Sequence, residues 1–168
     1  MFMFMLGLAL FAIVVHLLLM KPRSNAVVVE AVLLYLLVII FGFGTLLAGL
    51  MHVFNGPATA QMIGWPAGSP FQFEVGVADI SLGLVCILAP FFRGSYWLAA
   101  ILANSFFLFG AFIGHVHDYL TAGNAAAYNI GPDIFFSDLI VPLVMIGLYF
   151  VYRRLAGMGQ NLKNKLIK

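Results

Sequence analysis

The sequence is poor in charged residues. Only 8% of its 168 residues are Asp, Glu, Lys or Arg, whereas 64% are hydrophobic, and the mean hydropathy is +1.09. A typical soluble domain carries about 25% charged residues. The composition therefore excludes a soluble globular domain and indicates an integral membrane protein.

The sequence also has a single cysteine, Cys86, in the middle of an apolar run. A disulfide needs two cysteines, and a zinc ribbon or a CxxC redox motif needs at least two that are closely spaced. These uses of cysteine are therefore excluded within the chain.

Several cofactor classes lack the residues that they need. A retinal protein needs a lysine inside a membrane helix, and the lysines of this chain lie outside its apolar runs. A nucleotide-driven pump needs a soluble phosphate-binding domain, for which we find no segment. We therefore expect neither retinal nor a nucleotide. The basic tail, residues 153–168, suits contact with anionic lipid headgroups and does not indicate a nucleic-acid partner.

Long apolar runs dominate what remains. About twenty apolar residues cross roughly 30 Å of hydrocarbon as a helix. Backbone hydrogen bonding in lipid favours helices, and the short alternating strands of a barrel are not visible. We predict one all-α integral membrane domain over residues 1–168. It has five transmembrane helices, at about 2–20, 27–54, 73–92, 96–117 and 134–152, and a basic cytoplasmic tail at 153–168.

The positive charges give these helices an orientation. The eight cations fall in the first loop, the third loop and the tail: Lys21, Arg23, Arg93, Arg153, Arg154, Lys163, Lys165 and Lys168. Cytoplasmic segments are enriched in Lys and Arg, so we predict the N-terminus outside and the C-terminus inside the cell (inner) membrane. The first run lacks the basic start and the cleavage pattern of a signal peptide, and we interpret it as a retained helix.

Most acids and histidines lie near the opposite helix ends: Glu74, Asp79, Asp118, Asp133, Asp138, His52, His115 and His117. A polar side chain facing lipid is costly, so those within helices should face protein. Helical spacing then predicts two inward faces. The face of the fourth helix holds Asn104, Leu108, Ala111, His115 and Asp118, and that of the third holds Gln72, Gly76, Asp79, Gly83 and Cys86.

These faces predict a shared pocket on the outer side. Carboxylates without a basic partner take up protons, pair with protonated histidine or bind a cation. Mixed imidazole and carboxylate ligands suit zinc, iron, manganese or copper, although no strict ligand motif such as HExxH is present. The predicted metal ligands are His52, Glu74, His115, Asp118 and Asp138, with Asp79 and Asn104 as a proton or polar path. The same residues could instead cap helix ends, meet water or bond to neighbours.

The outer loop at residues 55–72 has a composition of its own. It carries three prolines and several glycines, so it cannot be helical throughout. Its apolar residues predict a position in the interface or folded over the bundle, where it would cover the pocket. Trp65, Tyr119 and Tyr128 are typical of the aromatic belt at a membrane surface.

Three segments resemble a known group of proteins. They are FQFEVGVADISLGLVCIL, FGAFIGHVHDY and GPDIFFSDLIVP. Together they resemble an uncharacterised family of small prokaryotic integral membrane proteins, which is similar in outline to DoxX-like four-helix membrane proteins. The resemblance covers the second to the fifth helix. It implies a DoxX-like bundle with an extra helix in front, and it names no reaction. Its recurring positions correspond here to Glu74, Gly114, His115, Asp138 and Pro142.

Three functions are compatible with these features. The leading hypothesis is a multi-pass membrane protein whose outward-facing His/Asp/Glu pocket binds a divalent metal or a comparable cation. If the protein is an enzyme, which the sequence does not favour, that metal would carry the reaction. The second hypothesis is a structural or accessory subunit of a larger membrane complex, or a homo-oligomer, and the third is a proton-linked carrier of a small solute.

Overall fold

A computed structural model describes residues 1–21 and 24–166 of the chain, with side chains up to residue 158. The described residues form helices joined by short turns. In chain order these are α1 (Phe2–Met20), α2 (Asn25–Tyr35), η1 (Leu36–Gly44), α3 (Thr45–Phe54), α4 (Gly56–Ile63), α5 (Phe71–Ile87), α6 (Ser95–Ala122), α7 (Ala127–Ile130), α8 (Pro132–Ile134), η2 (Phe135–Ile140) and α9 (Val141–Leu166). The prediction of an all-helical protein is confirmed for this part of the chain.

Two of the long helices contain a π-helical segment. The elements α2, η1 and α3 follow one another without a break over 30 residues, Asn25–Phe54. At 1.5 Å per residue this helix is about 45 Å long, so it must tilt or extend beyond a membrane. The second π-helical segment, η2, leads directly into α9. Single π-helical turns inside α-helices occur frequently at functional sites.

Among the described residues, four helical stretches are long and apolar enough to cross a membrane: Phe2–Met20, Asn25–Phe54, Ser95–Ala122 and Ala127–Met158. They correspond to the first, second, fourth and fifth predicted segments. The third predicted segment is present as α5, but with only 17 residues. It is shorter than predicted because the chain leaves the helix after Ile87 and turns through Pro90 and Gly94, whose φ of 72° favours glycine.

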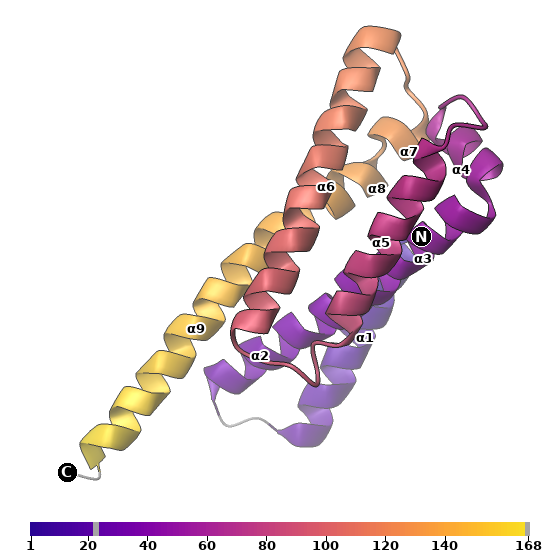
Figure 1. Cartoon of the computed structure of the whole chain (residues 1–168). Helices are drawn as coiled ribbons and strands as arrows, with labels where there is room; N and C mark the ends of the chain where they lie inside the picture. The colour runs from indigo at the N-terminus through magenta and orange to yellow at the C-terminus, as the bar shows by residue number, and fades with distance from the viewer. Residues whose placement is uncertain (22–23, 167–168) are drawn as a thin grey trace.

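The helix connections lie at two opposite ends of the molecule (Figure 1). We call one the basic end, which holds the C-terminal end of α1, the turn at 88–94 and the C-terminal part of α9. The other is the acidic end, which holds α4, α7 and the outer part of α6. The predicted separation of charge therefore has a counterpart in the fold. Arg23 and Lys168 lie outside the described residues.

The predicted tail at residues 153–168 is not a separate segment. Helix α9 continues through it to Leu166, so the last predicted helix is longer than its apolar run. Arg153 and Arg154 are exposed on this helical extension.

The basic half of the bundle has a tightly packed core. Leu33, Leu37, Trp97, Ile101 and Met145 come from three long helices and are fully buried. The Trp97 indole N–H donates to the Ala89 carbonyl (2.8 Å). The Arg93 guanidinium lies over the ring of Trp97 and pairs with Glu30. This half closes the bundle and holds the helices together.

Helices α3 and α5 approach each other closely through glycines. A Cβ atom on Gly49 would lie 2.6 Å from the Gly76 carbonyl oxygen, and one on Gly83 would lie 2.7 Å from the Leu46 nitrogen. Small residues allow such close helix contacts in membrane proteins. The predicted inward face of α5 is confirmed, because its buried residues are Gln72, Gly76, Asp79, Gly83 and Cys86.

Candidate functional site

A large cavity occupies the acidic half of the bundle. Its volume is about 1100 Å³, and residues from α1, η1, α3, α4, α5, α6 and the segment 128–138 form its walls. Most of the lining is apolar, with Met and Phe side chains prominent. This volume is at the upper end of the roughly 300–1,000 Å³ that is typical of small-molecule pockets.

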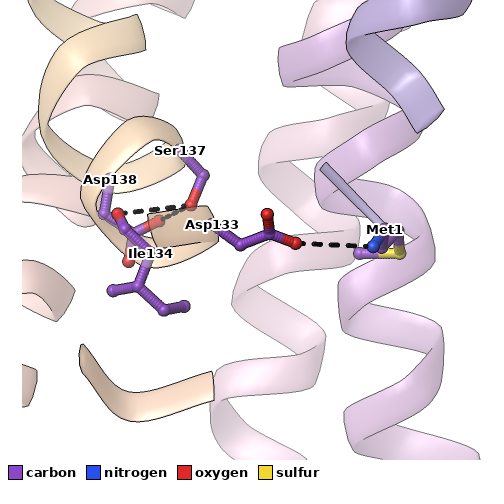
Figure 2. A network of polar contacts seen from close by, with 5 residues as sticks. All are labelled: Met1, Asp133, Ile134, Ser137 and Asp138. Atoms are coloured by element: carbon purple, nitrogen blue, oxygen red, sulfur yellow. Dashed lines mark hydrogen bonds and ion pairs between the residues drawn. The ribbon is translucent and has the colours of Figure 1, made fainter. Parts of the chain in front are cut away.

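Two buried carboxylates point into this apolar space. Asp79 on α5 and Asp138 in η2 are each 6% exposed, and both line the cavity. The Ser137 hydroxyl donates to the Asp138 carboxylate (2.6 Å; Figure 2). The Asp79 carboxylate has no hydrogen-bond or ion-pair partner among the described residues.

The cavity offers these acids very little positive charge. No Lys or Arg of the described residues lines it, and Glu74 adds a third carboxylate nearer the surface. The amino group of Met1 lies at the wall, where it pairs with Asp133 (3.6 Å; Figure 2). An uncompensated carboxylate in apolar surroundings is costly. The surroundings of these acids therefore favour their neutralisation, by protons or by a positively charged group.

His115 is fixed in one tautomer by its neighbours. Asn129 uses its Nδ2 to donate to the carbonyls of His115 (3.3 Å) and Asn124 (2.8 Å), so its Oδ1 must act as an acceptor. The Nδ1–H of His115 therefore donates to that Oδ1 (2.7 Å). The Nε2 atom of His115 has no hydrogen-bond partner among the described residues, and His115 and Asp138 line the same cavity.

His52 is held in a similar way at the top of α3. Its Nδ1 lies 2.7 Å from Oε1 of Gln72, a buried residue at the start of α5. A side-chain amide oxygen is an acceptor, so Nδ1 of His52 is the donor. Each of the two predicted histidine ligands thus has Nδ1 engaged and lines the cavity.

The loop after α4 covers one side of the site, as predicted for this connection. We call residues 64–70 the roof loop. Its Trp65 ring stacks on His115, with ring centroids 5.5 Å apart and planes 15° apart. Trp65 was expected in an interfacial aromatic belt, but its indole N–H donates to the Asp118 carboxylate (3.1 Å). Asn124 donates to the same carboxylate oxygen (2.7 Å) and to the Ile63 carbonyl (2.9 Å).

The structure brings together four of the five predicted ligands. His52, Glu74, His115 and Asp138 line the cavity, whereas Asp118 lies behind Trp65 and fixes the roof loop. Of the predicted polar path, Asp79 lines the cavity. Asn104 is fully buried away from it, where its Nδ2 donates to Cys86 Sγ (3.1 Å) and to the Ala100 carbonyl (3.2 Å).

Within the described part of the chain, no three His, Cys, Asp or Glu side chains form a group that could hold a metal ion. A metal needs its ligands within about 2.0–2.6 Å. The predicted metal site therefore stays a prediction, and it would require the side chains to move together.

Sequence reasoning missed the residues that position this site. Gln72 was placed on the inward face of α5 but without its partner, and Asn124 and Asn129 were not considered. The two asparagines lie in loops or very short helices, where helical phase gives no direction. Their one available signal is that both carry a side-chain amide in an otherwise apolar outer loop.

Comparison with known proteins places the chain in a family without assigning an activity. No curated protein and no solved structure matches it. Residues 1–158 match a family of unknown function, DUF6790, over nearly the whole chain. The chain therefore belongs to the DUF6790 family.

Proposed function

We propose that this protein is a multi-pass cell-membrane protein whose cavity at the acidic end opens to the extracytoplasmic side and binds a positively charged ligand. One observation carries the proposal. Asp79 and Asp138 are buried in a cavity that no Lys or Arg of the described chain lines, and the Asp79 carboxylate has no partner. A bound cation would neutralise them.

The membrane arrangement is part of the same proposal. Helix α5 would be the fifth crossing, because 17 residues span about 26 Å as a helix. Lys21 at the end of α1, Arg93 in the turn at 88–94 and the arginines of α9 belong to segments of the basic end, which supports a cytoplasmic position for that end. Helix α1 packs mainly against α2 and η1, which supports the idea of an extra helix in front of a DoxX-like bundle.

Ligand binding is the activity that we propose, and we propose no reaction. Titration calorimetry of the purified chain in lipid nanodiscs would test it, with Zn²⁺, Mn²⁺ and tetraphenylphosphonium as separate probes. We expect at least one probe to bind, and the double variant Asp79→Asn/Asp138→Asn to lose that binding. Glu30→Gln is the matched control, because Glu30 is an acid at the basic end. Binding by none of the probes, or binding that survives in the double variant, would reject the proposal.

A proton-linked carrier is a second candidate, favoured by the two buried carboxylates, Asp79 and Asp138, that line one cavity. The negative charge of these two carboxylates could be compensated either by protons or by a bound cation. The protein could therefore exchange protons for the cation. Uptake of the bound probe into proteoliposomes under a pH gradient would test it, and uptake unaffected by Asp79→Asn would contradict it. An accessory role in a larger complex stays a prediction that the size of the native complex would test.

A further inference from the structure

Resting on the proposed cation site, we infer that its ligand is an organic cation with an apolar body, of the quaternary ammonium or phosphonium class, and not a bare metal ion. The carboxylates would hold the charged centre and the apolar walls would surround the rest of the molecule. Size, wall chemistry and ligand geometry each support this choice.

The size of the cavity exceeds what an ion requires. Its volume of about 1100 Å³ suits a molecule of drug size or larger. A metal ion needs several oxygen, nitrogen or sulfur ligands in one tight shell. No such group exists among the described residues, since the carboxylates and imidazoles are distributed over a wide cavity.

Aromatic rings line the same cavity as the acids. They include Phe41, Phe71, Phe107 and Tyr128, and Trp65 packs on His115 beside them. The face of an aromatic ring attracts cations, and sites lined by aromatic rings are a common way to bind quaternary ammonium groups. An organic cation with a diffuse charge gives up its hydration more easily than a metal ion does, so an apolar wall suits it.

The remaining wall is deformable. Four of the eight methionines of the chain line the cavity: Met1, Met5, Met51 and Met62. Methionine side chains are flexible and polarizable, and they are common at binding surfaces that accept more than one partner. We therefore expect the site to accept several organic cations that differ in shape.

The buried carboxylate of Asp79 gives the cavity its selectivity for charge. It is 6% exposed, lines the cavity and has no partner in the described chain. Asp138 lines the same cavity, and among the described residues its carboxylate accepts a hydrogen bond from the Ser137 hydroxyl alone. A neutral or anionic molecule of the same shape would leave both acids uncompensated.

The test compares two ions of the same shape and opposite charge, tetraphenylphosphonium and tetraphenylborate, with Zn²⁺ and Mn²⁺ as metal probes. The full chain is titrated in nanodiscs, and the signal of empty nanodiscs is subtracted. We expect tetraphenylphosphonium to bind, tetraphenylborate not to bind specifically, and the metals not to bind. Tetramethylammonium, which has the charge without the apolar body, should bind about tenfold more weakly or less.

Variants connect the binding to the proposed residues. Asp79→Asn and Asp138→Asn should each weaken tetraphenylphosphonium binding by about tenfold or more, and Glu30→Gln should leave it unchanged. Circular dichroism and the unfolding midpoint show whether each variant is folded, and having two aspartate variants keeps the test valid if one fails to fold.

The outcomes separate this inference from the proposed function. If a metal binds and is lost in the double variant while tetraphenylphosphonium does not bind, the inference is overturned and the cation site stands. If tetraphenylborate binds as well as its cationic counterpart, the cavity does not select charge, and both are overturned. If no probe binds, the proposed function is rejected together with the inference.

Discussion

The two tryptophans of the chain lie in opposite halves of the bundle and have opposite surroundings. Trp97, in the basic half, is fully buried on a long helix, and its N–H donates to a backbone carbonyl. Trp65, in the acidic half, is only partly buried on the roof loop, and its N–H donates to the carboxylate of Asp118. The basic half is therefore a packed core, whereas the acidic half encloses a cavity.

The same long helices produce both halves. At the basic end their apolar side chains interlock around Trp97 and Met145. Toward the acidic end the space between them is not filled by side chains, and α4, the roof loop and α7 cover it. We therefore expect stability to depend mostly on the basic half and ligand binding on the acidic half. The following predictions test that division in order of decreasing effect.

Removal of the central aromatic ring of the basic half should have the largest effect. Trp97→Ala would leave a cavity in a closely packed core and remove the hydrogen bond to Ala89, so the free energy of unfolding should fall by about 3–5 kcal/mol. Trp65→Ala should cost much less stability but weaken ligand binding. Denaturant unfolding in detergent micelles measures the first effect, and equal losses in the two variants would contradict the division.

A methyl group between α3 and α5 should have the next largest effect. In Gly49→Ala the new Cβ would lie 2.6 Å from the Gly76 carbonyl oxygen and 2.8 Å from Asp79 Cβ, so the helices must separate. We expect a loss of about 2 kcal/mol in unfolding free energy and weaker binding, since Asp79 moves with α5. Gly147→Ala is the control, because nothing lies within 4 Å of its new methyl group. A Gly49→Ala protein as stable as the wild type would show that α3 and α5 have room for the added methyl group, and it would contradict this prediction.

Replacement of a cavity acid should separate stability from binding. Asp79→Leu removes a buried carboxylate that has no partner among the described residues and places apolar atoms in an apolar wall. The free energy of unfolding should rise by about 1 kcal/mol, while organic-cation binding is lost. Unfolding and calorimetric titration of the same sample measure both. A destabilised variant would indicate that Asp79 contributes to folding instead of to a site.

Loss of the support of the roof loop should have the smallest and most local effect. Asp118→Ala removes the bonds from Trp65 and Asn124. Each hydrogen bond to a charged group contributes on the order of 1–3 kcal/mol, so amide hydrogen exchange in the roof loop should accelerate by about tenfold or more. Exchange around Trp97 should not change. Acceleration across the whole protein would contradict a local role for Asp118.

Helical phase predicted much of this arrangement. The costs of polar groups in lipid and the 3.6-residue period were sufficient to identify the buried face of α5 and the inward direction of His115. The segregation of cations to one end also follows from the sequence. These features depend on local geometry alone, which a single sequence contains.

The remaining features depend on how distant segments meet. The 3.6-residue helical period placed Asp118 on the same helix face as His115. It could not show that the roof loop would bring Trp65 between Asp118 and the cavity. It also could not identify Asn129, which fixes the histidine tautomer from a four-residue helix. The π-helical segment that carries Asp138 and the volume of the cavity likewise result from tertiary packing.

The reactivity of cysteine tests the division between the two halves most directly. The chain has one cysteine, Cys86, which is fully buried in the packed region. Ala111→Cys places a second thiol on the α6 wall of the cavity. A water-soluble, membrane-impermeant maleimide is applied from the side of the membrane that the acidic end faces, and labelling is quantified by mass spectrometry. We predict an unlabelled wild type, a rapidly labelled Ala111→Cys variant, and protection of that variant by tetraphenylphosphonium. Labelling of Ala111→Cys no faster than that of Cys86, or unaffected by the cation, would contradict the account.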